Sequence, residues 1–237
     1  GMRALIDSAG LNGSLNARHI GFVLGPRINA AGRLDKAETA VRLCLTEESG
    51  EARTLAEELE KLNSKRKSVE KTVQSEAREE VDGYFSQGEC FGIVAGRPGW
   101  HQGTVGLVAG RLASRYRRPA AVIGFDESGL GRGSCRGIEN LDIIEILEGC
   151  SESLESFGGH RAAAGVVIKP VNLALFRETF NALCREKLEG KDLRPVLNID
   201  AWIGLDEANE TMLCGLDRLR PFGTGNSQPL FGIRKLN

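Results

Sequence analysis

Aromatic side chains are scarce in this sequence and make up 5% of its 237 residues. A surface that stacks many bases on aromatic rings is therefore not expected. The 31 lysines and arginines nearly balance the 32 acidic residues, so any nucleic-acid surface must be a local basic patch. No apolar run approaches the roughly 20 residues that a bilayer span needs, and we recognise no signal peptide. We expect a cytoplasmic protein without membrane contact.

Metal-ligating residue types are also few. The six cysteines form no CxxC pair, so we expect free, mostly buried thiols in a reducing compartment. Only three histidines occur, at His19, His101 and His160, and no cluster of aspartate and histidine surrounds them. We therefore assign no residue of this chain as a metal ligand.

The most informative run extends from Ser156 to Gly165. Gly158 and Gly159 precede His160, and three alanines follow within five residues. A glycine pair lets the backbone approach a ligand closely, and small residues allow tight packing of the next element. The pattern fits an anion site, and it fits equally a tight turn that leads into a strand of small residues.

A second unusual segment, Gly25 to Leu34, reads GPRINAAGRL. Pro26 and Gly32 bracket Arg27 and Asn29, and Arg33 follows. Such a segment can direct both arginines to one anionic site. A solvated loop with surface arginines is the simpler interpretation, and the composition favours it.

Apolar residues from Leu55 to Val81 recur at intervals of three, four and seven and predict one long helix. The residues between them are almost all charged or polar, so one narrow face packs and the rest is solvated. This pattern suits a strut that joins two lobes, and a coiled-coil dimer seam is the alternative. Gly83 is expected to end the helix.

A strand, helix and strand follow between Cys90 and Phe125, which favours a sheet covered by helices. The next segment, Gly129 to Gly137, alternates Arg132, Ser134 and Arg136 with small residues. In an extended chain, alternate side chains project to one side. Two guanidinium groups and a hydroxyl group on one face would form a phosphate receptor, and a solvated strand edge is the alternative.

Five blocks of this sequence resemble the RecJ family of single-strand-specific DNA exonucleases, which belongs to the DHH phosphoesterase superfamily. The blocks occur in the family's order and are GPRINAAGRL (25–34), WHQGTVGLVAGRLA (100–113), GSCRGI (133–138), GGHRAAAG (158–165) and LRPFGTGN (219–226). The GGHxxAAG pattern is shared with other DHH phosphodiesterases, whereas the first and fifth blocks are more specific to RecJ.

The resemblance implies an α/β fold with a mixed sheet flanked by helices, preceded by a long linker helix and followed by a truncated OB-fold segment. It divides the chain into the tail of a DHH catalytic domain (1–45), the linker helix (46–82), a DHH-associated substrate-binding domain (83–192) and a partial OB fold (193–237). It implies that the catalytic metal ligands lie in the DHH domain, which would be another part of the same full-length protein.

The resemblance also implies roles for residues. The family hydrolyses phosphodiester bonds with two metal ions, so Mn²⁺ or Mg²⁺ is expected in the full-length enzyme and none in this chain. Ser134 and Arg136 match the family's 5′-phosphate pocket, together with Arg33 or, as second choice, Arg27. Cys135 and Gly137 depart from the family's glycine and serine, which puts one phosphate hydrogen bond in doubt.

By the same resemblance, His160 with the backbone of Gly158 and Gly159 would face the scissile phosphate. Trp100 and His101 would contact a nucleotide. Asn29 belongs to the first block and Arg132 directly precedes the third, and we expect both to contact the substrate strand.

The expected function is thus the substrate-binding part of a 5′-to-3′ single-stranded-DNA exonuclease of repair and recombination. The chain alone would be inactive and monomeric, and single-stranded DNA would be its partner. Two alternatives remain: a related phosphodiesterase for oligonucleotides or cyclic dinucleotides, and a non-catalytic module that binds nucleic acid or oligomerises through residues 51–81.

Overall fold

The chain forms two compact units in the computed structural model, which describes residues 1–86, 90–139, 141–194, 196–223 and 225–234. One unit comprises Gly1–Asn29, Thr39–Glu60 and Arg194–Asn237, and the other comprises Ala30–Glu38 and Lys61–Leu193. The second unit holds a five-stranded sheet and most of the residues singled out above. Within the described residues, no helix is both long and apolar enough to cross a membrane.

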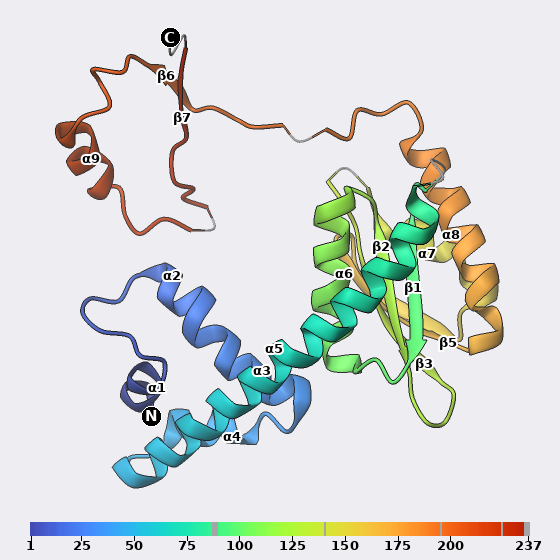
Figure 1. Cartoon of the computed structure of the whole chain (residues 1–237), viewed down its shortest axis with the longest axis horizontal. Coiled ribbons are helices and arrows are strands. Elements are labelled where there is room, and N and C mark those ends of the chain that lie inside the picture. The colour runs from blue at the N-terminus through green and yellow to red at the C-terminus, as the bar shows by residue number, and fades with distance from the viewer. Residues whose placement is uncertain (87–89, 140, 195, 224, 235–237) are drawn as a thin grey trace. The chain divides into compact units, whose positions relative to one another are not determined.

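The sheet of the second unit is mixed (Figure 1). Its strands follow the spatial order β1-β2-β3-β5-β4, and β1 and β2 are parallel while the other pairs are antiparallel. The strands are β1 (Ile93–Pro98), β2 (Ala120–Phe125), β3 (Gly131–Arg136), β4 (Ser156–His160) and β5 (Ala163–Ile168). The expected α/β fold with a mixed sheet between helices is confirmed.

Helices cover the two faces of this sheet to different extents. On one face, α7 (Ile143–Gly149) and α8 (Leu173–Leu188) pack on alternate strand residues such as Ile123, Cys135 and Val166. On the other, α6 (Gln102–Tyr116) packs on β2 and β3. The β4–β5 end of that second face is lined by small residues, among which Gly158 and Gly165 are exposed.

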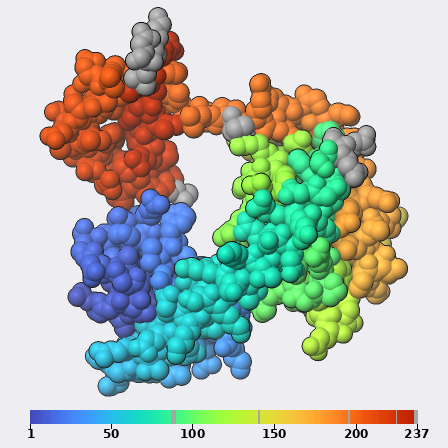
Figure 2. Space-filling view, in the orientation of Figure 1, coloured from blue at the N-terminus to red at the C-terminus, as the bar shows by residue number. Residues whose placement is uncertain are grey.

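The long helix predicted from the apolar repeat is α5 (Ser49–Phe85), with 37 residues. Val73, Ala77 and Val81 pack with α6, β1 and β2 in the second unit's core, so this half of the stripe is not free to form a dimer seam. Figure 2 shows α5 (cyan to green) at the surface along its length. Its buried side also carries a polar cluster, in which Glu70 pairs with Arg66 and with Arg111 of α6.

The expectation that Gly83 ends this helix is wrong. The helix continues to Phe85 because the two residues after Gly83 are anchored by tertiary contacts. The hydroxyl of Tyr84 donates to the carbonyl of Val94 at 3.2 Å, and the ring of Phe85 lies 4.7 Å from that of Tyr116. These contacts offset the roughly 1 kcal/mol that a helical glycine costs relative to alanine.

The loop interpretation of Gly25–Leu34 is wrong as well, because the whole segment is helix α3 (Gly25–Leu34). Pro26 is tolerated because α3 continues directly from a π-helical turn (Ile20–Leu24), in which the N–H of Gly25 donates to the carbonyl of Ile20 and the regular hydrogen-bond ladder is already shifted. Ala30 and Ala31 are fully buried. The small residues thus serve close packing of a helix rather than a flexible joint.

Apart from two 3₁₀ turns of the second unit (Ser151–Ser153 and Pro170–Asn172), the remaining elements lie mainly in the first unit. They are α1 (Met2–Ser8), α2 (Ala17–His19), a π-helical turn (Ile20–Leu24), α4 (Glu38–Leu45), β6 (Ala201–Ile203), α9 (Glu210–Asp217) and β7 (Phe231–Ile233). Strands β6 and β7 pair in parallel. Thr224 of the LRPFGTGN block lies outside the described residues, as does Pro195 at the start of the expected OB fold.

Candidate phosphate-binding site

A polar hollow of about 290 Å³ lies in the second unit, where three elements meet. The residues that line it are Gly32 and Arg33 at the end of α3, Gln102, Gly103, Val105 and Gly106 at the start of α6, and Arg132, Gly133, Ser134 and Arg136 of β3. No carboxylate side chain is among the residues that line it. Three arginines therefore line one small cavity.

Strand β3 supplies the wall of this hollow because its side chains alternate. Arg132, Ser134 and Arg136 project toward α6, whereas Cys135 points into the core on the other face. The guanidinium group of Arg136 donates to the Ser134 hydroxyl at 2.6 Å and to the carbonyl of Cys135 at 2.9 Å. These bonds fix the Arg136 side chain and leave other N–H groups of its fork for a ligand.

The start of α6 closes another side. His101 caps the helix, since its Nδ1 accepts from the N–H of Gly103 at 3.0 Å. A guanidinium nitrogen of Arg33 donates to the carbonyl of Gly103 at 3.2 Å. This bond holds the Arg33 side chain beside the helix start.

The positive charge of the arginines that line the hollow is not balanced by any carboxylate in its lining. Burial lowers the pKa of Arg136, and the neighbouring charge of Arg33 lowers it further. Among the described residues, neither Arg33 nor Arg136 forms an ion pair. A bound anion would relieve this repulsion and accept hydrogen bonds from both groups.

The two arginines of α3 have different surroundings. Arg27 is largely buried and pairs with Glu60, and it also donates to the carbonyl of Val23 at 2.7 Å. Arg33 lines the hollow, and Asn29 is exposed on α3 without reaching it. Of the two candidates, Arg33 is therefore the arginine that lies beside Ser134 and Arg136.

His160 lies at the end of β4, on the edge of the sheet. The register pairs His160 with Ala163 and Ala163 with Arg136, so these residues form one row across three strands. Directly opposite residues share a face, which places His160 on the Arg136 face, with Cα atoms about 10 Å apart, or two strand spacings. The side chain of His160 is exposed.

Positions 158 and 159 are occupied by glycine for different structural reasons. Gly158 is opposite Gly165 on the His160 face, and a Cβ there would meet nothing within 4 Å. Gly159 has a φ of 153°, and a Cβ would lie 2.5 Å from the carbonyl oxygen of Ala163. Gly159 is thus required by the hairpin itself, whereas Gly158 keeps the sheet surface flat.

Trp100 does not fit the expected nucleotide contact. It is buried in the core with α5 and α6, and its indole N–H donates to Glu76 at 2.6 Å. Both the ring and its one donor are therefore committed to packing. His101 is exposed, and with Nδ1 engaged as the helix cap its Nε2 is the nitrogen that remains for a ligand.

The departure from the family at Cys135 falls outside the hollow. The Cys135 side chain is fully buried on the opposite face, where burial raises the pKa of the thiol to about 12. Gly137, the second departure, follows the strand and donates its N–H to the carbonyl of Ala162 at 3.0 Å. Neither residue interrupts the hydrogen bond between Arg136 and Ser134.

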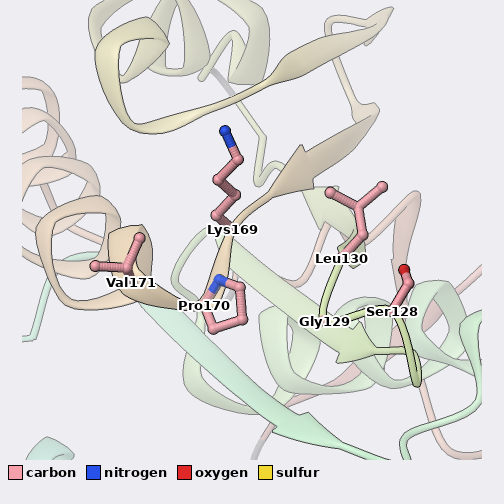
Figure 3. Close-up of a pocket in the computed structure, with 6 residues that line it drawn as sticks. All are labelled: Ser128, Gly129, Leu130, Lys169, Pro170 and Val171. Carbon is pink, nitrogen blue, oxygen red and sulfur yellow. The ribbon is translucent and has the colours of Figure 1, made fainter.

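A larger hollow of about 490 Å³ lies at the ends of the inner strands, between the β2–β3 turn and the 3₁₀ turn (Pro170–Asn172) that follows β5 (Figure 3). Leu130, Pro170 and Val171 make its lining mainly apolar. Figure 3 shows Lys169 extending away from Pro170, and its ammonium group pairs with Glu155 at 3.0 Å. Its single cation is thus already neutralised, and we do not assign a phosphate to this hollow.

A metal centre does not fit the residues that the structure describes. They contain no group of three or more histidine, cysteine, aspartate or glutamate side chains arranged to hold an ion. We derive no chemical step through a metal on this chain.

Sequence reasoning missed the contribution of α6. Gln102, Gly103 and Gly106 line the hollow, although only Trp100 and His101 of this block were expected to contact a ligand. The spacing of Gly103 and Gly106, three residues apart within a predicted helix, was the available signal, since such residues share a helix face.

Comparisons with known proteins agree with this architecture. Residues 90–186 match the DHHA1 domain family. The chain is 37% identical over 97% of its length to the single-stranded-DNA-specific exonuclease RecJ of Bacillus subtilis, and 35% identical over 98% to that of Escherichia coli. It covers 29% and 41% of these two proteins.

Solved structures give the same result. The crystal structure of RecJ from Thermus thermophilus in complex with Mn²⁺ matches 98% of this chain with a TM-score of 0.84 and 29% identity. The corresponding structure with Mg²⁺ matches 97% of it with a TM-score of 0.82 and 30% identity. The chain spans about a third of the length of these two structures.

Proposed function

We propose that this chain, which contains a DHHA1 domain at residues 90–186 and is homologous to part of the RecJ exonucleases, is the substrate-binding part of a 5′-to-3′ single-stranded-DNA exonuclease. The full protein would then be a hydrolase of phosphodiester bonds in DNA repair and recombination. The convergence of Arg33, Arg132 and Arg136 on one hollow without a carboxylate is the observation that carries this proposal.

The chemistry of a DNA end explains why such a hollow would be useful. A phosphate monoester carries about −1.5 to −2 charges at neutral pH, whereas an internal phosphodiester carries one. Arginine forks and a serine hydroxyl group recognise the extra charge and the extra oxygen. In our proposal Arg33, Ser134 and Arg136 bind the 5′-phosphate, and exposed Arg132 supports them.

The rest of the strand would lie across the open end of the same sheet face. Gly158 and Gly165 add no side chains there, so a nucleic-acid backbone can approach the sheet closely. We propose that His160 donates to the phosphodiester next to be cleaved and that His101 contacts a nucleotide through Nε2. Trp100, Arg27 and Asn29 have no direct role in this proposal: Trp100 is buried, Arg27 is paired with Glu60, and Asn29 is not among the residues that line the hollow.

We propose metal ions for the full protein and none for this chain. The titles of the related structures name Mn²⁺ and Mg²⁺, and we propose that the full protein uses one of them to activate water. Its ligands would belong to a DHH catalytic domain. We therefore expect this chain alone to bind DNA and to hydrolyse little or none.

The domain division remains part of the proposal. Residues 1–45 would complete the DHH domain, 46–82 would link it to the DHHA1 domain at 83–192, and 193–237 would begin an OB fold. We propose a cytoplasmic location and a monomeric state.

The test compares DNA ends rather than DNA sequences. Fluorescence anisotropy would measure the affinity of this chain for oligothymidylate that carries a 5′-phosphate, a 3′-phosphate or no terminal phosphate. We expect the 5′-phosphorylated strand to bind most tightly, with the other two alike. Equal affinity for all three strands would refute the terminal-phosphate pocket.

A further inference from the structure

Two glycines of α6 form the floor of the basic hollow. Gly103 and Gly106 are three residues apart and share the helix face that lines it. A glycine inside a helix lowers the stability of that helix relative to alanine. Helix formation therefore does not explain either residue, and the surroundings must.

Gly103 allows α3 and α6 to approach each other. A Cβ atom at this position would lie 1.9 Å from the carbonyl oxygen of Arg33, a backbone atom that cannot move without shifting the end of α3. Gly103 thus sets the place of Arg33 at the hollow, and any side chain here would disturb the fold as well as the site.

Gly106 has a different neighbourhood. A Cβ atom here would lie 3.1 Å from Nη2 of Arg136, 3.2 Å from Oγ of Ser134 and 3.4 Å from Cβ of Ser134. All three are side-chain atoms rather than backbone atoms, and a shift of a few tenths of an ångström in the Arg136 and Ser134 side chains would make room for an alanine. The new methyl group would, however, stand directly against the two donor groups that face the hollow.

We infer that Gly106 is a specificity-determining residue: its missing side chain leaves the space in which a terminal phosphate oxygen reaches Arg136 and Ser134 together. A phosphate oxygen must come within about 2.7–2.9 Å of a guanidinium nitrogen to form a charge-assisted hydrogen bond. A methyl group against Nη2 occupies that approach. This inference rests on the proposed function, because it assumes that the hollow binds the 5′-phosphate.

Gly110 provides a matched control on the same helix. A Cβ atom at Gly110 would meet nothing within 4 Å outside its own helix backbone, and Gly110 does not line the hollow. Gly106→Ala and Gly110→Ala therefore make the same chemical change in α6. Only the first adds a methyl group to the proposed phosphate site.

The experiment measures the ratio of affinities for 5′-phosphorylated and 5′-hydroxyl oligothymidylate in the wild-type chain and in both variants. We expect Gly106→Ala to reduce this ratio roughly tenfold, as the loss of one charge-assisted hydrogen bond would, while affinity for the 5′-hydroxyl strand stays the same. Gly110→Ala should keep the wild-type ratio. A merely structural effect would lower both affinities together.

The outcomes separate the two proposals. A wild-type ratio of one would overturn the proposed function, and this inference with it. A high wild-type ratio that Gly106→Ala retains would overturn the inference alone. If Gly106→Ala fails to fold, the comparison is repeated in a Ser134→Ala background, where the hydroxyl contact at 3.2 Å is gone and the methyl group is less crowded. There the ratio must fall further on adding Gly106→Ala, and an unchanged ratio would again overturn the inference.

Discussion

Arg33 and Arg136 lie near each other with no acidic side chain lining the hollow between them. Such an arrangement costs free energy in the absence of a ligand, because burial and like charge both disfavour the charged guanidinium of Arg136. The Ser134 hydroxyl group holds Arg136 in place but does not neutralise it. Single substitutions at this cluster should therefore affect binding more than folding.

Replacing Arg136 tests this directly. Arg136→Ala should weaken binding of a 5′-phosphorylated strand by roughly ten- to a hundredfold, the equivalent of about 1.5–3 kcal/mol for a hydrogen bond to a charged group. Arg53→Ala is the control, since Arg53 is exposed on α5 and does not line the hollow. Anisotropy titrations of both variants check the prediction, and an equal loss in each would point to a general charge effect instead.

For Trp100 we expect the reverse: a substitution should lower the stability of the fold and leave DNA binding unchanged. Trp100→Phe keeps most of the ring but removes the N–H that bonds to Glu76. We expect a loss of about 1–3 kcal/mol in the free energy of unfolding, because a half-buried carboxylate loses a partner, with DNA affinity unchanged. Urea unfolding and the same titration would check it, and a lower affinity in a variant that stays folded would restore Trp100 to the binding surface.

Among the elements, β3 was the most predictable from sequence and α3 the least. The sequence alone predicts that Arg132, Ser134 and Arg136 share one face, because successive side chains of a strand point to opposite sides of the sheet. In α3, glycine, proline and asparagine all signal a loop, and the close packing of Ala30 and Ala31 overrides them. Contacts between elements distant in sequence, such as Arg33 with Gly103, could not be read from local pattern.

The continuation of α5 through Gly83 allows a test of that packing argument. Gly83 is exposed in a helical conformation, and a Cβ there would meet nothing within 4 Å. Gly83→Ala should therefore raise the free energy of unfolding by up to about 1 kcal/mol. Gly129→Ala is the contrasting variant: its φ of 81° is strained for alanine, so thermal melts should show it destabilised. A destabilised Gly83→Ala would contradict the helix end described here.

At the scale of the whole molecule, the reactivity of the six cysteine thiols measures how tightly the chain is packed. Cys44 and Cys214 are exposed, and the other four are buried. A thiol reagent at neutral pH should therefore modify two thiols rapidly in the folded chain and all six in denaturant. Rapid modification of three or more thiols without denaturant would show that the core is looser than the structure implies.

The buried thiols also predict a pH dependence. Burial raises the pKa of Cys90 to about 11, and those of Cys135 and Cys150 to about 12, from an ordinary 9.0. The folded state therefore retains protons that the unfolded state loses above pH 9, so stability is fully present below that value and falls as the pH rises toward 11 and 12. Urea midpoints measured from neutral to alkaline pH check this, with Cys135→Ala as the variant whose decline should be shallower.

The most direct measurement is a crystal structure of this chain with a 5′-phosphorylated dinucleotide. The account predicts the terminal phosphate in the hollow between α3, α6 and β3, within hydrogen-bond distance of Arg33, Ser134 and Arg136, with its sugar directed toward the row that ends at His160. A terminal phosphate bound elsewhere, such as beside Lys169 in the apolar hollow, or an internal phosphodiester in its place, would contradict it.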